Sequence, residues 1–201
     1  MVNEKFLTGY FSEMKEVIER MPLEKIDRAI EALFDAWKEE RQVFLLGNGG
    51  SAATASHAAN DFNKATVVEG KKRFRAFCLS DNVPLVSALT NDLGWSEVYV
   101  EQLKNYFRPG DYVVVFSVHG GKAEDPAREW SQNLLKAIRY ANDHGGKTIA
   151  FTGYDGGAMK NLADLCVIIP VNSTPQTESF HMALEHLIVT CLREKIAACD
   201  E

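Results

Sequence analysis

The chain contains, at residues 42–62, the stretch Gln42-Val-Phe-Leu-Leu-Gly-Asn-Gly-Gly-Ser-Ala-Ala-Thr-Ala-Ser-His-Ala-Ala-Asn-Asp-Phe62. A short apolar run ends in a glycine loop, and an alanine-rich stretch that favours a helix follows. Such a strand-to-helix junction directs free backbone N–H groups and the positive end of the helix dipole at one point, where missing Cβ atoms let an anion approach. The loop therefore predicts a phosphate site, with these candidate ligands: Asn48, Gly49, Gly50 and Ser51.

Two titratable residues, His57 and Asp61, follow on the predicted helix. They are four residues apart, so their side chains share one helix face about a turn and a half beyond the loop. One interpretation is a solvated helix face, and the other is a functional pair beside the anion site. The glycines also fit the dinucleotide pattern G-x-G-x-x-G/A, but the acidic residue that this pattern needs comes late, at Asp81. We expect no nucleotide cofactor.

Taken together, the glycine loop and the motif His57-x-x-x-Asp61 resemble the SIS (sugar isomerase) domain and, within it, the phosphoheptose isomerases. The resemblance covers roughly residues 40–195. It implies an α/β fold, a three-layer αβα sandwich with a five-stranded parallel sheet of the flavodoxin-like type. It also implies that Asp61 stands where those enzymes carry a catalytic Glu, which is one methylene longer.

Composition and charge restrict the class of protein. The 201 residues are 46% hydrophobic and 25% charged, and the net charge of −6 argues against a nucleic-acid partner or an anionic membrane surface. The four cysteines show no metal-ligand spacing, and no apolar run is long enough to span a membrane. We expect a soluble cytoplasmic protein with two parts: an N-terminal helical segment at 1–40 and an SIS domain at 41–201.

The N-terminal segment carries apolar residues at helical intervals between residues 3 and 38, and Pro22 divides it into two helices. A helical pair ahead of the first strand has no face of the sheet reserved for it. It therefore either packs on a second subunit or covers the edge of its own domain. The family resemblance implies a homo-oligomer, with a homotetramer favoured.

Further strands are predicted at 75–79, 112–116, 147–152 and 165–170, and they alternate with helical segments as in a parallel sheet covered on both faces. The most apolar of them ends in a second glycine loop, residues 117–122. Ligands of parallel sheets collect at the carboxyl ends of the strands, so the two loops should face each other. The candidate ligands in the second loop are Ser117, His119, Gly120 and Lys122.

The second loop departs from the family. SIS domains typically carry Ser-x-Ser-Gly-x-Ser here, whereas this chain places His119 and Lys122 where two of those serines would stand. Cations can replace hydroxyls as phosphate ligands, so phosphate binding is still expected. The identity of the sugar is not predicted by this loop. The chain also looks longer here, by an insertion at 123–130. The segment at Asn91-Asp92 resembles an Asn-Asp of the family that could line the site; its alternative interpretation is a helix end and turn.

The last predicted helix follows Thr174, a further candidate substrate ligand, and is apolar on nearly every side. Such a helix is buried, and its few polar groups need partners. His186 is either a hydrogen-bonded core histidine or a functional one. Aligned on His186, the segment resembles the phosphoheptose isomerase helix, which implies that His186 is the catalytic His and that Glu178 replaces a family Gln.

These residues suggest two kinds of chemistry. Asp61 as base and His186 as acid would interconvert an aldose and a ketose through an enediolate. A Zn²⁺ site is the other possibility, with these ligands: His57, Asp61, Glu178 and His186. The resemblance implies a phosphorylated sugar as substrate, most readily the conversion of sedoheptulose 7-phosphate to D-glycero-D-manno-heptose 7-phosphate. The alternative is a non-catalytic SIS protein that binds a sugar phosphate as a regulator or acts as an oligomeric partner of a replication initiator.

Overall fold

The computed structural model describes residues 2–122 and 131–199, so the predicted insertion at 123–130 lies outside the described residues. The strands are short and regular, and helices separate them along the chain. In chain order the elements are α1 (Val2–Glu19), α2 (Leu23–Lys38), β1 (Gln42–Gly47), α3 (Gly50–Lys64), β2 (Arg75–Cys78), α4 (Val83–Leu93), the 3-10 turn η1 (Trp95–Glu97), α5 (Val100–Tyr106), β3 (Tyr112–Ser117), α6 (Gln132–Asp143), β4 (Lys147–Thr152), α7 (Met159–Leu162), β5 (Leu165–Ile168) and α8 (Thr174–Ala198).

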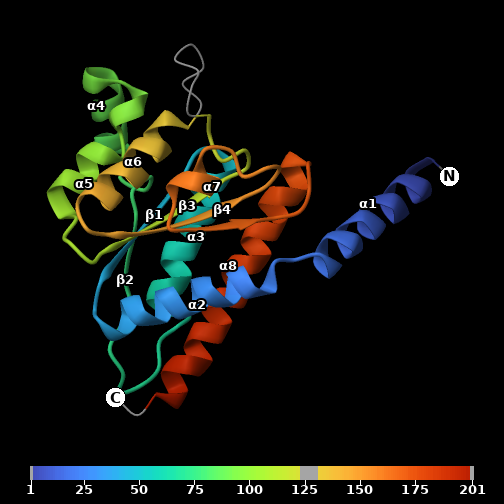
Figure 1. Ribbon diagram of the computed structural model, residues 1–201, viewed down its shortest axis with the longest axis horizontal. Helices are drawn as coiled ribbons and strands as arrows, with labels where there is room; N and C mark the ends of the chain where they lie inside the picture. The colour runs from blue at the N-terminus through green and yellow to red at the C-terminus, as the bar shows by residue number, and fades with distance from the viewer. Residues whose placement is uncertain (1, 123–130, 200–201) are drawn as a thin grey trace.

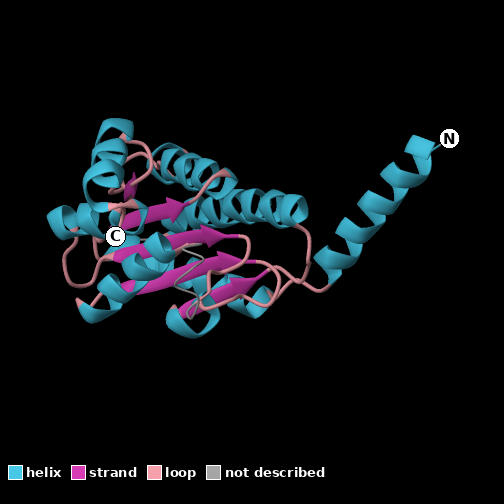
Figure 2. Cartoon of the chain, turned by 90° about the horizontal axis from the view of Figure 1, so that it is seen from above, coloured by secondary structure: helices cyan, strands magenta, loops and turns pink. Residues whose placement is uncertain are grey.

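The strands form one parallel sheet in the order β2-β1-β3-β4-β5. Figure 2 shows this sheet with helices on both sides. Successive side chains of a strand point to opposite faces, so Val43 and Leu45 pack with α2, α3 and α8, while Phe44 and Leu46 pack with α5 and α6. Both faces are therefore covered, as near-continuous apolar strands require. The α/β three-layer fold predicted from the sequence is confirmed.

The glycine that ends β1 is required by close packing. A Cβ added to Gly47 would lie 2.2 Å from the carbonyl oxygen of Ser51, in the first turn of α3. Real Cβ atoms do not approach backbone oxygen so closely, so only glycine lets the helix begin directly against the end of the strand. This contact sets where α3 starts relative to the sheet edge.

The two N-terminal helices behave differently. Helix α2 packs into the core through Ile26, Leu33 and Trp37. Helix α1 contacts the core near its C-terminal end, where Val17 is buried, but the rest of the helix projects away from the domain in both views (Figures 1 and 2). Its side chains Phe6 and Phe11 are 72% and 66% exposed. Helix α1 therefore does not cover the edge of its own domain, which was one of the two predicted possibilities.

Helices α3 and α8 lie on the same face of the sheet and run side by side in the same direction (Figure 1). The start of α3 faces the start of α8, since Gly50 lies next to Glu178, and their middles also meet, since His57 contacts His186. Within the described part of the chain, no helix is both long enough and apolar enough to span a membrane.

Candidate functional site

A cavity of about 740 Å³ opens at the carboxyl ends of the strands, among the loops that follow β1, β3, β4 and β5. Both glycine loops contribute to it, as the topology predicts. Seven of the side chains predicted to bind substrate line it: Asn48, Ser51, Ser117, His119, Lys122, Thr174 and Glu178. Of the other predicted residues, Gly49 and Gly120 belong to the backbone of the same two loops, and Gly50 is the first residue of α3.

The cavity carries charge of both signs. His119 and Lys122 are exposed on the β3 loop, and the His119 ring lies 4.3 Å from that of Tyr154, centroid to centroid. The carboxylate of Glu178 lies over Gly50, where an added Cβ would be 2.3 Å from Oε1. One side of the cavity can therefore hold an anion through cations, while the Glu178 side can accept hydrogen bonds from sugar hydroxyls.

A pair of amides fixes the first loop. Asn48 Nδ2 donates to Asn133 Oδ1 at 3.0 Å, and Asn133 Nδ2 donates back to Asn48 Oδ1 at 2.8 Å. Asn133 is fully buried in α6, and the Tyr99 hydroxyl donates to the Gly47 carbonyl from behind. Asn133 was not predicted from the sequence; an amide among the apolar positions of an amphipathic helix was the available signal.

Asn91 and Asp92 do not join this cavity. They lie exposed at the end of α4, where Asn91 Nδ2 donates to Asp92 Oδ1 at 2.7 Å, and neither is among the described residues that line the cavity. The physical reason is topological. Helix α4 follows β2, an edge strand of the sheet, whereas the cavity lies among the loops that follow the other four strands. Both residues lie in the last turn of α4, and their role in substrate binding stays a prediction.

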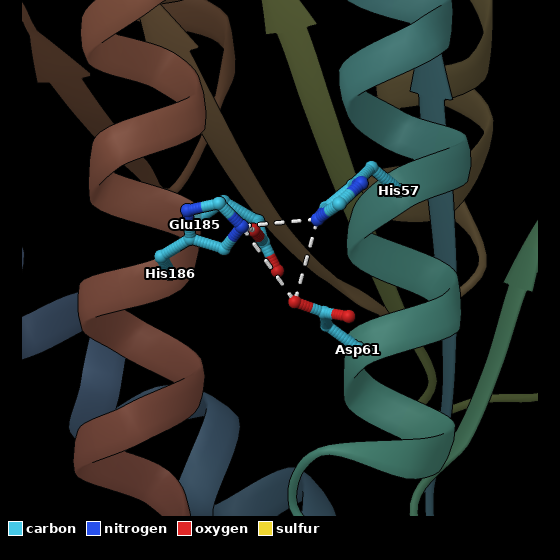
Figure 3. Close-up of side chains that lie close together, drawn as sticks. All are labelled: His57, Asp61, Glu185 and His186. Atoms are coloured by element: carbon cyan, nitrogen blue, oxygen red, sulfur yellow. Dashed lines mark hydrogen bonds and ion pairs between the residues drawn. The ribbon is translucent and has the colours of Figure 1, made fainter.

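The second half of the site is a cluster between the middles of α3 and α8, formed by His57, Asp61, Glu185 and His186 (Figure 3). The two imidazoles meet with 3.0 Å between their Nε2 atoms. Asp61 Oδ2 lies 3.5 Å from His57 Nε2 and 3.8 Å from His186 Nε2, so the predicted acid and base contact each other within one chain. Glu185 Oε2 lies 3.5 Å from His186 Nε2.

Burial differs sharply across the cluster. The side chains of His57 and His186 are 43% and 53% exposed, whereas that of Glu185 is 1% exposed. Neither carboxylate oxygen of Glu185 has a hydrogen-bond partner among the described residues. Burial, with the nearby charge of Asp61, raises the pKa of Glu185 to about 7. The cluster thus opens to the surface through its histidines and has an unsatisfied carboxyl group at its floor.

The donor set fits a divalent metal ion. Ligand atoms bound to one Zn²⁺ at about 2 Å lie roughly 3 to 4 Å from one another. Four of the six distances in the cluster run from 3.0 to 3.8 Å, and all six are within 4.8 Å. The predicted ligands His57, Asp61 and His186 are present. Glu178 is not with them, because it precedes His186 by eight residues on α8, a rise of about 12 Å; the carboxylate found in its place is Glu185.

Helix α8 also carries His181, a buried histidine whose ring lies 5.8 Å from that of Phe116, centroid to centroid. It is completely buried, and burial lowers the pKa of His181 to about 4, although the Thr152 backbone opposes part of that effect. Neither ring nitrogen meets hydrogen-bond geometry with a described residue. His181 is therefore held neutral in the core.

Comparison with known proteins gives consistent matches. The profile of the SIS domain family matches residues 9–153. The lincomycin biosynthesis protein LmbN of Streptomyces lincolnensis is 43% identical over 160 residues, which are 78% of this chain; the match spans only 57% of the length of LmbN. A phosphoheptose isomerase of Chlorobaculum tepidum is 35% identical over 204 residues, covering 100% of this chain and 91% of its own.

A solved structure supports the same arrangement. The structure of a phosphoheptose isomerase from Francisella tularensis superimposes with a TM-score of 0.84, covering 96% of this chain and 100% of its own. At 22% sequence identity this likeness concerns the fold.

Proposed function

Because the chain belongs to the SIS domain family, we propose that it is a sugar-phosphate isomerase that interconverts an aldose and a ketose through an enediolate. The observation that carries the proposal is the contact of Asp61 with His186, 3.8 Å apart in one chain. A carboxylate and an imidazole at this spacing can act on adjacent atoms of one small substrate. The other observation in its favour is the mixed-charge cavity at the start of the same two helices.

The chemistry assigned to each group balances without a redox partner. Asp61 removes the proton from the carbon beside the carbonyl and returns it at the neighbouring carbon. His186 delivers a proton to the carbonyl oxygen and accepts one from the adjacent hydroxyl, so that the double bond to oxygen moves by one carbon. A Zn²⁺ ion bound by the cluster would act as a Lewis acid towards the developing oxyanion. His57 supports Asp61, whose Oδ2 lies 3.5 Å from its Nε2.

We assign the phosphate end of the substrate to the cavity, near His119 and Lys122. Six residues of α3 separate Ser51 in the cavity from His57 in the cluster, a rise of about 9 Å. That distance suits an open-chain sugar phosphate with several carbons between the carbonyl and the phosphate. We propose sedoheptulose 7-phosphate, with D-glycero-D-manno-heptose 7-phosphate as its product, because relatives named phosphoheptose isomerase match the full chain. Because the chain also matches LmbN, which is not named as a phosphoheptose isomerase, the test panel must include other sugar phosphates.

A coupled assay over a panel of ketose phosphates tests the proposal. Asp61→Asn should lower kcat at least about 100-fold, because a general base contributes roughly 10²- to 10⁴-fold. The matched control is Asp143→Asn, which removes an exposed carboxylate at the end of α6. Wild-type protein that binds sugar phosphates but turns over none of them would support the non-catalytic alternative and overturn the isomerase.

We also propose that the protein is a homotetramer, assembled through α1. The apolar side chains of this projecting helix are exposed in the single chain: Phe6, Leu7, Phe11 and Ile18. Exposed apolar area of this kind is typical of a protein interface. Light scattering of the wild type should give four times the chain mass, and Phe6→Ser with Phe11→Ser should shift it towards smaller species; a monomeric wild type would overturn the proposal.

A further inference from the structure

Two ring side chains lie beside each other in the lining of the cavity, His119 from the loop after β3 and Tyr154 from the turn after β4. Their ring centroids are 4.3 Å apart, with 42° between the ring planes. The Tyr154 hydroxyl reaches the start of α8, where it lies 3.5 Å from Thr174 Oγ1. The proposed proton transfers and the proposed phosphate contact do not use the Tyr154 ring, so its place in the cavity needs its own explanation.

The backbone at Tyr154 does not favour a tyrosine. Its φ is +51°, in the left-handed region that a bulky side chain rarely adopts. Glycine and asparagine fit that region with less strain, and both are common in turns. The turn itself therefore does not require an aromatic residue, and a strained residue beside a cavity is typical of a functional position.

The two rings are carried on backbone segments that are fixed to each other on both sides of His119. On one side, the Val118 carbonyl accepts a hydrogen bond from the backbone N–H of Gly153 at 2.9 Å. On the other side, Gly120 packs so closely on the Gly156 carbonyl that an added Cβ would overlap its oxygen. The spacing of the rings is thus set before a ligand arrives, which lowers the entropy cost of binding against them.

We propose that Tyr154, backed by His119, forms an aromatic wall against which the carbon chain of a sugar phosphate packs. Sugar carbons carry C–H groups as well as hydroxyls, so a sugar has an apolar side that can cover the face of a ring. Thr174 and Glu178 are four residues apart on α8, so their side chains share one helix face about 6 Å apart along the axis. Because the Tyr154 hydroxyl lies at Thr174, the sugar can cover the ring while its hydroxyls donate to Glu178.

The inference rests on the proposed function, because it takes a sugar phosphate as the ligand of the cavity. It deepens that function by giving two parts of the cavity different tasks. Lys122 contacts the phosphate, whereas Tyr154 contacts the carbon chain attached to it. Inorganic phosphate has no carbon chain, so only the sugar phosphate gains affinity from the Tyr154 ring.

The test is equilibrium dialysis of the full chain with sedoheptulose 7-phosphate and, separately, with inorganic phosphate, since dialysis counts bound ligand whether or not it is isomerised. Tyr154→Asn removes the ring and suits the backbone. It should raise the Kd for sedoheptulose 7-phosphate about tenfold, as expected for losing roughly two buried methylene groups of contact, and the Kd for inorganic phosphate less than about twofold. Tyr154→Phe keeps the ring and should stay within about twofold for both ligands. The matched control Tyr106→Asn, which removes an exposed ring at the end of α5, should change neither Kd.

Melting curves show whether each variant is folded, and Tyr154→Gly, which also suits the backbone, is the second variant without the ring. An unchanged Kd for sedoheptulose 7-phosphate in the folded ring-free variants, or an equal loss for both ligands, would overturn the inference. So would a loss in Tyr154→Phe as large as that in Tyr154→Asn, because the hydroxyl would then be the contact. A wild type that binds both ligands equally well, or neither, would overturn it too. The expected binding pattern without turnover of any sugar phosphate would contradict the proposed isomerase alone.

Discussion

Acid should destabilise the folded protein through His181. This ring is completely buried beside Phe116, and its pKa is lowered to about 4 by burial. In the unfolded chain a histidine has its ordinary pKa of about 6.5. Below that pH the unfolded state binds a proton that the folded state refuses, so protonation favours unfolding. The stabilisation is fully present above pH 6.5 and is lost as the pH falls towards 4.

The size of the effect follows from the two pKa values. Linkage between about 6.5 in the unfolded chain and about 4 in the folded one removes roughly 2 kcal/mol at pH 5 and roughly 3 kcal/mol at pH 4. Most small domains have only about 5 to 15 kcal/mol of stability, so the loss should be easy to detect. The window from pH 7 to pH 5 is the useful one, because ordinary carboxylates remain largely ionised there.

Urea unfolding at fixed protein concentration, with chelator present, measures this slope. Between pH 7 and pH 5 the free energy of unfolding of His181→Gln should fall by about 2 kcal/mol less than that of the wild type, whatever the stability of the variant at pH 7. His57 and His186 are unchanged in both proteins, so any contribution they make to the slope cancels. His144→Gln, at an exposed position, is the matched control. Equal slopes for the wild type and His181→Gln would show that the buried ring is not held neutral.

Three further substitutions test the two loops. Gly47→Ala should lower the free energy of unfolding by about 3 kcal/mol, read from urea curves, because its Cβ would meet the Ser51 carbonyl at 2.2 Å. Asn133→Ala should lower the free energy of unfolding by about 2 kcal/mol, because the Asn48 amide loses both of its hydrogen bonds to Asn133. In a double-mutant cycle, Asn48→Ala combined with Asn133→Ala should cost less than the sum of the two single substitutions. Lys122→Gln should raise the KM for sugar phosphates and weaken its dependence on salt, with kcat little changed; a change in kcat alone would contradict a phosphate contact.

The fold was predictable because its signals are local. The strands are short, mostly apolar segments of four to six residues, and β3 is fully buried along its length. The strand-to-helix junction can be recognised in the sequence because the close contact of Gly47 with Ser51 requires a glycine at the end of β1. The projection of α1 was not predictable in the same way, since an apolar helical pattern does not say whether its partner is the same chain.

The site was predictable only as far as separate segments could be placed at one edge or on one helix face. His57, Asp61 and His186 meet as the resemblance implied. The fourth position was transferred from the family by alignment, and that gave Glu178, whereas this chain carries an acid beside His186. The sequence signal for Glu185 was an acidic residue among the apolar positions of the last helix. Its role cannot be interpreted without the distances between that helix and α3.

The parallel course of α3 and α8 has a consequence for how such a site can change. Both helices start at the sheet edge, so the depth of any side chain is fixed by counting residues from that edge. The first turns of both helices lie at the cavity, and the groups proposed to transfer protons lie at a fixed distance further along the two helices. Under the proposed function, changes in the loops around the cavity could admit a longer or shorter sugar without moving the reactive groups on the two helices.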